Sequence, residues 1–282
     1  MELPGPLVSP AWLVDHLGDD GLVVADVRWA REGSGREAFE GGHIEGAVFL
    51  DADDDLSDVG QGAGRHPLPT PEAFARTMRA VGVGDDTCVV AYDDASGSVA
   101  ARLWWMLDAT GHVVALLDGG LGSWTRPLAA GPATQRHATQ AFTPRPWPAA
   151  RLTDADGVAA ALRTSGVVLD ARTAERYRGE VEPIDPVAGH IPGARSAPWS
   201  DNLDAATGRF LPAERLRERY ETLGVRTGDD AIAYCGSGLT AALDLLALRL
   251  AGFDRDGRLY GASWSGWIED PSRPVTVGGE PG

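Results

Sequence analysis

Cys235 is the residue whose position most clearly suggests chemistry. It follows the apolar run Ala231-Ile232-Ala233-Tyr234 and precedes Gly236-Ser237-Gly238-Leu239-Thr240. The sequence from 240 to 250 is rich in alanine and leucine, which form helices readily. The pattern predicts a buried strand that ends at Cys235, a tight loop, and a helix that begins near Thr240.

A thiol in such a loop lies where backbone N–H groups and the positive end of a helix converge. Both favour the thiolate, which is the nucleophilic form of cysteine. The glycines at 236 and 238 cost stability unless the backbone must approach something closely. The alternative is an inert cysteine packed at the end of a strand, because free cysteine is often buried. We favour the reactive interpretation.

The length and composition are typical of a soluble protein of two domains. The chain has 282 residues, of which 43% are hydrophobic and 23% charged. It has no apolar run long enough to span a membrane, and its first residues lack the pattern of a secretory signal. Two cysteines in so long a chain argue against a disulfide scaffold, and Cys88 is expected to be buried and inert. These features predict a reducing, cytoplasmic location.

The charge excludes some classes of partner. The formal net charge is −16, from 25 basic and 41 acidic residues, and such a surface repels phosphodiester backbones. We therefore expect no nucleic-acid partner and no membrane partner. The histidines and cysteines lack zinc spacing, and the acidic run 51–55 lacks the glycine and distal glutamate of a calcium loop. No metal and no cofactor are expected. Small anionic substrates remain compatible, because N–H dipoles and one or two arginines can reverse the charge locally.

The elements that must position Cys235 occur twice in the chain. A strand pattern ending in Asp26-Val27-Arg28 precedes Gly42-His43-Ile44-Glu45-Gly46-Ala47, and Asp170-Ala171-Arg172 precedes Gly189-His190-Ile191-Pro192-Gly193-Ala194. The two aspartates are 144 positions apart and the two histidines 147. Arg65-His66-Pro67-Leu68-Pro69, with a helix over 71–80, likewise matches Gly208-Arg209-Phe210-Leu211-Pro212, with a helix over 213–223. We expect Arg28 and Arg172 to pair with Asp26 and Asp170.

The order of elements predicts an α/β fold with a parallel central sheet, flanked by helices, in each copy. Strand patterns alternate with helical patterns, as in βαβ units. A proline-containing stretch separates the copies and is typical of a linker. We therefore predict domains over 1–130 and 151–282 joined by a linker over 131–150, with an irregular tail after Asp270. The expected strands are 22–27, 88–92, 113–117, 167–171, 231–234 and one near 258–260.

The two copies differ at the position that Cys235 occupies in the second copy. Tyr92-Asp93-Asp94-Ala95-Ser96-Gly97 occupies the place of the cysteine loop, so an aspartate stands where the second copy has a thiol. A carboxylate cannot perform sulfur chemistry. The first copy is then either a structural partner or one wall of a cleft, and we favour the cleft.

These features together resemble the tandem-domain rhodanese superfamily of sulfurtransferases, over about 9–267. The resemblance depends on the two Gly-His-Ile-x-Gly-Ala segments, the first loop without cysteine, and the cysteine loop of the second copy. It implies two rhodanese-like domains, the first non-catalytic, and a reaction in two steps. Cys235 would take a sulfur atom from a donor as a persulfide and pass it to cyanide or a thiol, including that of a thioredoxin-like protein.

The resemblance also implies the donor and the roles of the loop. The donors of the superfamily are thiosulfate and 3-mercaptopyruvate, and the uncharged loop is similar to the 3-mercaptopyruvate type, which we slightly favour. The N–H groups of the loop would stabilise the thiolate and the persulfide. Ser237 would donate or relay a proton, and Thr240 would either contact the sulfur or only cap the helix. The loop residues assigned to donor binding are Gly236, Gly238, Leu239 and Thr240.

Two residues outside the loop complete the implied site. Arg176 matches the family arginine that holds the anionic end of the donor, although a surface arginine is the alternative. His43 matches a first-copy histidine linked to a serine relay, although buried hydrogen bonding is the alternative, and His190 is expected to be structural. A second family arginine is replaced by Ile184, so that Arg178 or another residue must supply this contact or the contact is missing.

The sequence supports two alternative functions less well. Cysteine phosphatases of related fold need an arginine at the end of a longer loop, and Thr240-Ala241-Ala242 offers none. A persulfide carrier that delivers sulfur to a protein partner without turnover on small donors would also use an intact cysteine loop. Turnover on free donors would separate an enzyme from such a carrier.

Overall fold

The chain divides into two compact units, each of which is described by itself. The structure is a computed structural model that describes residues 1–31, 34–133, 140–164, 166–228, 230–253 and 257–282. One unit comprises residues 1–58, 68–147 and 206–209, and the other comprises 59–67, 148–205 and 210–282. Part of the linker predicted over 131–150, residues 134–139, lies outside the described residues, and 141–148 contain no helix or strand.

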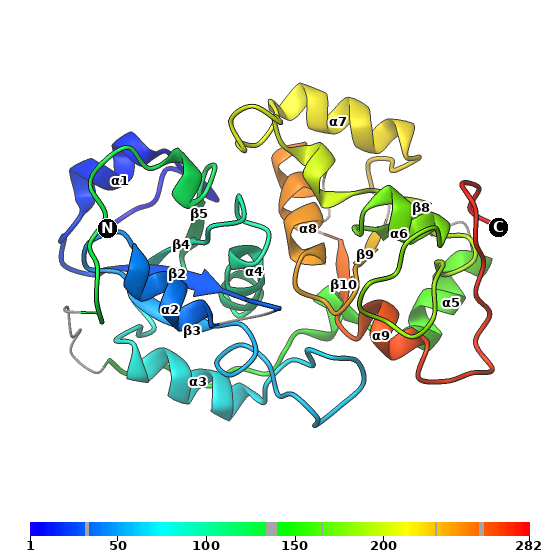
Figure 1. The fold of residues 1–282 in the computed structure, drawn as a ribbon, viewed down its shortest axis with the longest axis horizontal. Helices are drawn as coiled ribbons and strands as arrows, with labels where there is room; N and C mark the ends of the chain where they lie inside the picture. Colours follow the sequence, from blue (N-terminus) through cyan, green and yellow to red (C-terminus); the bar gives the residue numbers. More distant parts are fainter. Residues whose placement is uncertain (32–33, 134–139, 165, 229, 254–256) are drawn as a thin grey trace. The chain divides into compact units, whose positions relative to one another are not determined.

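The first unit contains a five-stranded parallel sheet in the order β1-β5-β4-β2-β3. Figure 1 draws its strands and helices in blue to green. The strands are β1 (Leu7–Val8), β2 (Leu22–Arg28), β3 (Val48–Asp51), β4 (Cys88–Tyr92) and β5 (Val114–Leu117). The helices are α1 (Pro10–His16), α2 (Gly35–Gly41), α3 (Pro71–Ala80) and α4 (Ala100–Ala109), with a short 3-10 turn at Leu121–Ser123.

The second unit repeats this arrangement, with a parallel sheet in the order β6-β10-β9-β7-β8 (Figure 1). Its strands are β6 (Leu152–Thr153), β7 (Val168–Asp170), β8 (Arg195–Ser196), β9 (Ile232–Tyr234) and β10 (Arg258–Tyr260). Its helices are α5 (Ala155–Arg163), α6 (Ala174–Arg178), α7 (Ala213–Thr222), α8 (Ala241–Leu250) and α9 (Ser263–Trp267), with 3-10 turns at Ala149–Arg151 and Trp199–Asn202.

The equivalent strand order confirms the predicted α/β fold and the internal repeat. The predicted strands and the helices at 71–80 and 213–223 are present, and all their ends agree with the prediction within one residue. The short strands β1, β3, β6 and β8 were not predicted, because two to four residues carry little periodic pattern. The tail after Asp270 contains no helix or longer strand, as expected.

The helix that follows the cysteine loop is α8, and the helix that follows the corresponding loop of the first unit is α4. Both helices are buried on almost every side, so each holds the loop that precedes it. In α8 every residue from Ala241 to Leu248 is buried, and in α4 the same holds from Ala100 to Leu107. Full burial of a leucine side chain contributes about 1.5–3 kcal/mol. Within the described ranges, no helix is long and apolar enough to cross a membrane.

Each copy also contains the buried aspartate–arginine pair that the sequence predicted. Arg28 donates from Nε to Asp26 over 2.7 Å, and Arg172 donates from Nη2 to Asp170 over 2.7 Å. Tyr234 packs beside the second pair, and its hydroxyl accepts a hydrogen bond from the backbone N–H of Ile191. These pairs connect the ends of β2 and β7 to the segments that follow, so the same polar network holds each copy together.

A buried carboxylic acid in α8 makes the stability of the second unit depend on pH. Asp244 accepts a hydrogen bond from Nδ2 of Asn202 at 2.6 Å, and burial raises its pKa to about 7 although Arg219 opposes the shift. The folded state therefore keeps a proton that the unfolded chain, with an ordinary pKa near 4, releases. This proton stabilises the fold at acidic pH, and the stabilisation is lost as the pH rises through about 4 to 7.

We predict that Asp244→Asn removes this dependence while it keeps the oxygen that accepts from Asn202. Between pH 5 and pH 8 the wild type should lose about 2–3 kcal/mol more unfolding free energy than the variant. Urea denaturation of both proteins at the two pH values measures the difference. Equal losses in the two proteins would show that Asp244 is ionised in the folded state at pH 5.

Candidate active site

The structure places Cys235 directly after β9, in a loop that is held by the start of α9. Only 2% of the cysteine is exposed. Its N–H donates to Oγ of Ser263 at 3.0 Å, and its carbonyl accepts from the N–H of Trp264 at 3.0 Å. The N–H of Ser265 donates to the carbonyl of Gly236 at 2.9 Å. The loop is therefore fixed at its first two residues before any substrate arrives.

The sulfur atom itself accepts a backbone hydrogen bond. The N–H of Gly238 lies 3.1 Å from Sγ of Cys235 and donates to it. Gly238 has a φ of +87°, and a side chain there would overlap the carbonyl of Gly261, so the turn that aims this N–H at the sulfur requires glycine. Such a donor favours a negative charge on sulfur in a site from which water is largely excluded.

The corresponding loop of the first unit shows how many N–H groups this backbone arrangement can offer to an anion. The carboxylate of Asp93 is fully buried and accepts four backbone hydrogen bonds of 2.7–2.8 Å. Burial raises the pKa of Asp93, and these hydrogen bonds oppose the shift. The donors are the N–H groups of Ala95, Gly97, Val99 and Ala100. The aspartate thus fills with its own carboxylate the place where the second unit carries a thiol.

Ser237 is paired with a histidine that the sequence analysis did not assign. Nδ1 of His66 lies 2.6 Å from Oγ of Ser237, and both residues are about 5% exposed. His66 is in the segment 59–67, which belongs to the second unit although the chain has not yet completed the first. The pair can hold and move a proton within reach of the cysteine loop.

The segment that carries His66 is anchored on α9 and on Glu269, which follows this helix. The N–H of Gly64 donates to the carboxylate of Glu269 at 2.8 Å, and the N–H of Arg65 donates to Oγ of Ser265 at 3.0 Å. Gly64 has a φ of +80°, and a side chain there would overlap the carbonyl of Ala262. These contacts fix the backbone on the N-terminal side of His66.

Arg176 lies near the cysteine loop in a network of buried carboxylates. Its Nε and Nη2 donate to the two oxygens of Glu182 at 3.1 and 2.7 Å, and Nη2 also donates to Asp185 at 3.0 Å. Burial acts to raise the pKa of Glu182, but the hydrogen bonds from Arg176 and from backbone N–H groups hold it below its usual range. Arg172 joins the network through Nη1, 3.3 Å from Glu182. These ion pairs hold Arg176 in one orientation.

The structure does not bring Arg178 to the place of the second arginine that Ile184 replaces. Ile184 is 38% exposed. Arg178 donates to Glu180 at 2.8 Å from Nε and from Nη2, and its side chain is 33% exposed. Arg178 is therefore engaged on the surface. Arg65 instead forms an ion pair with Asp185, the carboxylate that also binds Arg176.

The contacts of Thr240, Leu239, His43 and His190 can be compared with the roles expected for these residues. Thr240 is at the N-cap position of α8, but its side chain makes no capping hydrogen bond, so the alternative that it only caps the helix through its side chain is wrong. Leu239 is buried at 4% exposure. His43 stacks on Phe39 in the first unit, and its Nδ1 lies 2.9 Å from the Phe39 carbonyl. His190 makes the same contacts with Tyr177, as a structural histidine would.

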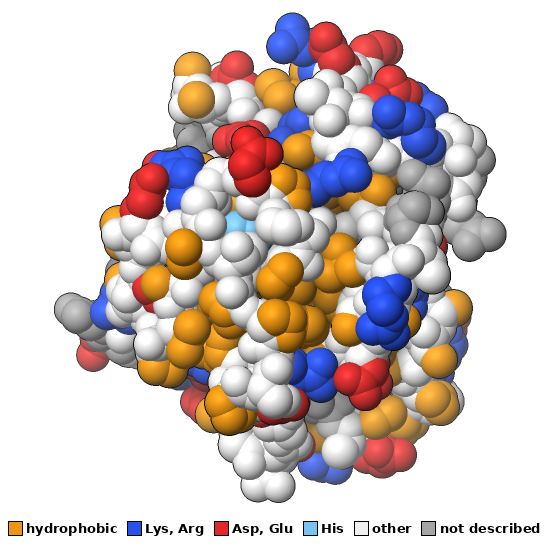
Figure 2. Space-filling view, turned by 90° about the vertical axis from the view of Figure 1, so that its right-hand side faces the viewer, with side chains coloured by type: hydrophobic (Ala, Val, Ile, Leu, Met, Phe, Trp, Pro, Cys, Tyr) orange, Lys and Arg blue, Asp and Glu red, His pale blue; other side chains and the backbone are white. Residues whose placement is uncertain are grey.

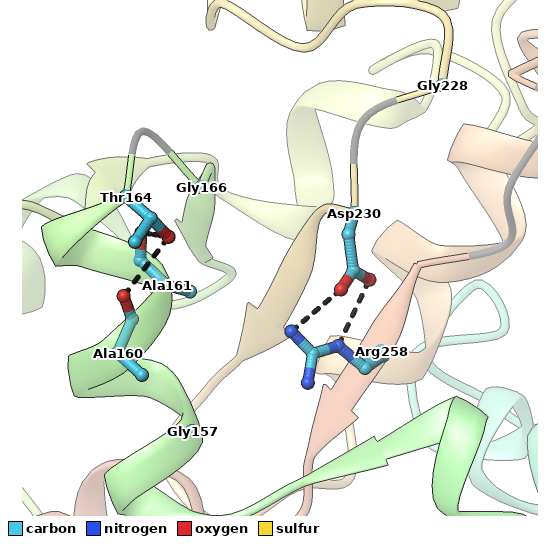
Figure 3. A pocket seen from close by; sticks show the side chains of 8 residues that line it. All are labelled: Gly157, Ala160, Ala161, Thr164, Gly166, Gly228, Asp230 and Arg258. Atoms are coloured by element: carbon cyan, nitrogen blue, oxygen red, sulfur yellow. Dashed lines mark hydrogen bonds and ion pairs between the residues drawn. The ribbon is translucent and has the colours of Figure 1, made fainter.

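A hollow at the opposite edge of the second sheet is separate from this site. It measures about 470 Å³ and lies beside Gly166, Asp230 and Arg258, which are near the amino ends of β7, β9 and β10 (Figure 3). Cys235 follows the carboxyl end of β9. The guanidinium of Arg258 is paired with Asp230 at 2.8 and 3.0 Å. This arginine is thus already neutralised by a carboxylate.

The surface arginines are dispersed. On the face drawn in Figure 2, the basic side chains lie in separate places, several of them next to carboxylates. Arg178, Arg258 and Arg273 of the second unit are each paired with an acidic residue. The described residues on this face form no continuous basic surface of the kind that binds phosphodiester backbones.

Comparisons with known proteins agree with this architecture. The family described as "Rhodanese-like domain" matches residues 9–127 and 154–270. A "Probable 3-mercaptopyruvate sulfurtransferase" of Pseudomonas aeruginosa is 46% identical, over 96% of this chain and 98% of the relative. "Thiosulfate/3-mercaptopyruvate sulfurtransferase 2" of Arabidopsis thaliana is 31% identical, over 96% of this chain and 86% of the relative.

A solved structure of similar fold covers nearly the same range. The crystal structure of SseA from Escherichia coli, described as a 3-mercaptopyruvate sulfotransferase with the rhodanese fold, superimposes with a TM-score of 0.81. It is 32% identical in sequence, and the match covers 92% of this chain and 99% of SseA. Two rhodanese-like domains, a single cysteine loop in the second of them, and full-length relatives all agree. The chain therefore belongs to the family of tandem rhodanese-domain sulfurtransferases.

Proposed function

We propose that Cys235 takes sulfur from 3-mercaptopyruvate and carries it to an acceptor as a persulfide. The observation that supports this most is the position of the Cys235 sulfur. It accepts a hydrogen bond from Gly238 N–H in the loop that also contains Ser237, and Ser237 is bonded to His66. A nucleophile stabilised by an N–H group, with a proton donor nearby, is what this transfer needs.

The first step forms one bond and breaks one. The Cys235 thiolate attacks the sulfur of 3-mercaptopyruvate, and a sulfur–sulfur bond forms as the carbon–sulfur bond of the donor breaks. The electron pair of the broken bond remains on carbon, so the leaving group is the enolate of pyruvate. The proton of the donor thiol stays with the new persulfide or passes to a base.

The leaving enolate needs a proton, and Ser237 with His66 can deliver it. The Ser237 hydroxyl would donate its proton to the enolate carbon while it takes one from Nδ1 of protonated His66. At 2.6 Å the two groups are within the distance that proton transfer requires. The product is pyruvate, and the charge on the histidine is neutralised in the same step.

This requirement is the main reason to favour 3-mercaptopyruvate over thiosulfate. Thiosulfate releases sulfite, a stable anion that needs no proton to leave. A buried Ser–His pair would therefore assist only the first donor. Gly236, Ser237 and Thr240 also carry no charge, whereas a dianionic donor would gain most from basic residues in the loop.

In the second step an acceptor removes the outer sulfur. A thiolate or cyanide attacks it, the sulfur–sulfur bond breaks, and the Cys235 thiolate is restored. We propose a small thiol, cyanide or the thiol of a thioredoxin-like protein as the acceptor. Both cysteines of the chain are free, which suits the reducing cytoplasm that we propose as its location.

The test compares the two donors under one condition. We expect kcat/KM for 3-mercaptopyruvate to exceed that for thiosulfate by at least about tenfold, which corresponds to about 1.4 kcal/mol of transition-state stabilisation. Steady-state assays with cyanide as the common acceptor measure both values. A higher kcat/KM for thiosulfate would reverse the donor assignment, and no turnover with either donor would favour a persulfide carrier loaded by a partner.

A further inference from the structure

One serine of α9 contacts both segments that the proposed reaction uses. Ser265 donates its backbone N–H to the carbonyl of Gly236 at 2.9 Å, which holds the cysteine loop. Its hydroxyl accepts from the backbone N–H of Arg65 at 3.0 Å, which holds the segment that contains His66. The hydroxyl also donates to the carbonyl of Ala262 at 3.2 Å, so the start of the helix orients it.

These contacts close a ring with the pair of Ser237 and His66. Ser237 follows Gly236 in the chain, and His66 follows Arg65. Oγ of Ser237 lies 2.6 Å from Nδ1 of His66. Ser265 therefore joins the two residues that precede the pair, and the pair joins the same two segments again one residue later. A spacing that is fixed at two neighbouring positions leaves the segments little freedom to shift relative to each other.

The segment packs on α9 through backbone atoms at Gly64 and Gly266. A Cβ atom added to Gly266 would lie 3.2 Å from the backbone nitrogen of Gly64, and a side chain on Gly64 would overlap the carbonyl of Ala262. This close packing brings the N–H of Arg65 to Ser265, which is only 7% exposed. Little water reaches the serine, so removing its hydroxyl would leave the N–H of Arg65 without this partner.

We propose that Ser265 is a positioning residue that keeps the Ser237–His66 pair in register with the cysteine loop. The inference rests on the proposed function, because the pair matters to the reaction only if the departing enolate takes a proton from it. Ser265 acts through the backbone of Gly236 and Arg65 rather than on the reacting atoms. A displacement of about 1 Å at a reacting group can lower a rate by about 100-fold, so the spacing of these segments controls the rate.

The test is Ser265→Ala, which removes the hydroxyl and keeps the backbone N–H that binds Gly236. The cysteine loop therefore stays held, and only the link to the His66 segment is lost. We expect kcat with 3-mercaptopyruvate to fall by about 10–100-fold, because the proton pair is displaced. Thiosulfate needs no proton when sulfite leaves, so its kcat should stay within about twofold of the wild type. Steady-state assays with cyanide as the acceptor measure both values.

The matched control is Ser196→Ala. Ser196 belongs to β8 of the same unit, and its buried hydroxyl has no hydrogen-bond partner among the residues that the structure describes. Removing this hydroxyl breaks no contact, so kcat with each donor should stay within about twofold of the wild type. Thermal melts of both variants check that each protein is folded at the assay temperature.

The two half-reactions give a readout that does not depend on thiosulfate. Loading of Cys235 by 3-mercaptopyruvate requires the proton, whereas discharge of the sulfur to cyanide does not. Ser265→Ala should therefore slow loading by about 10–100-fold in single-turnover experiments and keep the wild-type rate of discharge. Slower discharge would show that the loss of the hydroxyl has disturbed the cysteine loop, which would contradict the proposal.

A double variant separates positioning of the pair from a general structural role. If Ser265 acts only through the pair, adding Ser265→Ala to Ser237→Ala should change kcat with 3-mercaptopyruvate by less than about twofold. A serine that only stabilised the fold would instead multiply the two losses, and this result would overturn the proposal.

The remaining outcomes distinguish this inference from the proposed function. If Ser265→Ala keeps kcat with 3-mercaptopyruvate within about twofold of the wild type, or lowers kcat equally with both donors, Ser265 does not position the pair. Wild-type turnover would leave the proposed function intact in either case. Absence of wild-type turnover with 3-mercaptopyruvate would overturn both proposals.

Discussion

Replacing Cys235 by serine is expected to abolish sulfur transfer from 3-mercaptopyruvate and from thiosulfate while the protein stays folded. A serine oxygen cannot form the sulfur–sulfur bond of the intermediate, so the loss of kcat/KM should exceed about 1,000-fold. The hydroxyl is close to the thiol in size, and it can still accept the hydrogen bond that Gly238 N–H gives to the sulfur. Steady-state assays with each donor and a thermal melt check the two parts of the prediction.

The chain offers a matched control in its other cysteine. Cys88 is in β4, is 3% exposed, and has a pKa that burial raises, so it should remain a thiol and take no part. Cys88→Ser should therefore keep wild-type turnover. After incubation with donor, mass spectrometry should detect an added sulfur of about 32 Da in the wild type and in Cys88→Ser but not in Cys235→Ser. Turnover in Cys235→Ser, or sulfur carried on Cys88, would contradict the assignment of the nucleophile.

The sequence was sufficient for those parts of the fold that depend on short-range patterns. The apolar runs that became β4 and β9 are continuous, as expected for strands buried on both faces of a parallel sheet. The glycines and the helix after Cys235 indicated the loop, and comparison with Asp93 predicted that the second copy carries the nucleophile. Each of these inferences depends on patterns of residues a few positions apart, which for Asp93 and Cys235 are compared between the two copies.

Contacts between distant segments could not be predicted in this way. His66 and Ser237 are 171 residues apart, and the pattern around His66 resembles an ordinary loop. A periodic pattern tells which face of its own element a residue occupies, but not which other segment packs there. The segment 59–67 belongs by its contacts to the second unit, so a domain boundary drawn along the chain at 130 cannot reveal its role.

The repeat itself contained a signal that distinguishes the two histidines. His43 recurs as His190, and the structure gives both the same contacts with a carbonyl and an aromatic ring four or thirteen residues away. A residue present in both copies is explained by what the copies share, which is the fold. His66 has no such counterpart, because Arg209 stands at its place in the matching segment. Asymmetry between the copies is thus the better guide to chemistry, as it was for Cys235 and Asp93.

The Ser237–His66 pair leads to the prediction that best separates the two donors. Ser237→Ala removes the group that would protonate the enolate, so kcat for 3-mercaptopyruvate should fall by about 100–1,000-fold. Thiosulfate needs no proton when sulfite leaves, so its kcat should be largely retained. Thiosulfate turnover is therefore the internal control, since it requires the same Cys235 persulfide and the same folded loop. The measurement is kcat for each donor with cyanide as acceptor.

The histidine can be tested by the same comparison. His66→Gln keeps a polar side chain beside Ser237 but cannot carry a proton, and it should reproduce the selective loss with 3-mercaptopyruvate. If the two residues act as one unit, the double variant should be little worse than either single variant, because the second substitution removes a function that is already lost. An equal fall in kcat with both donors would instead mean that Ser237 and His66 stabilise the persulfide or the loop. Additive losses would mean that Ser237 and His66 act separately, although Oγ and Nδ1 lie 2.6 Å apart.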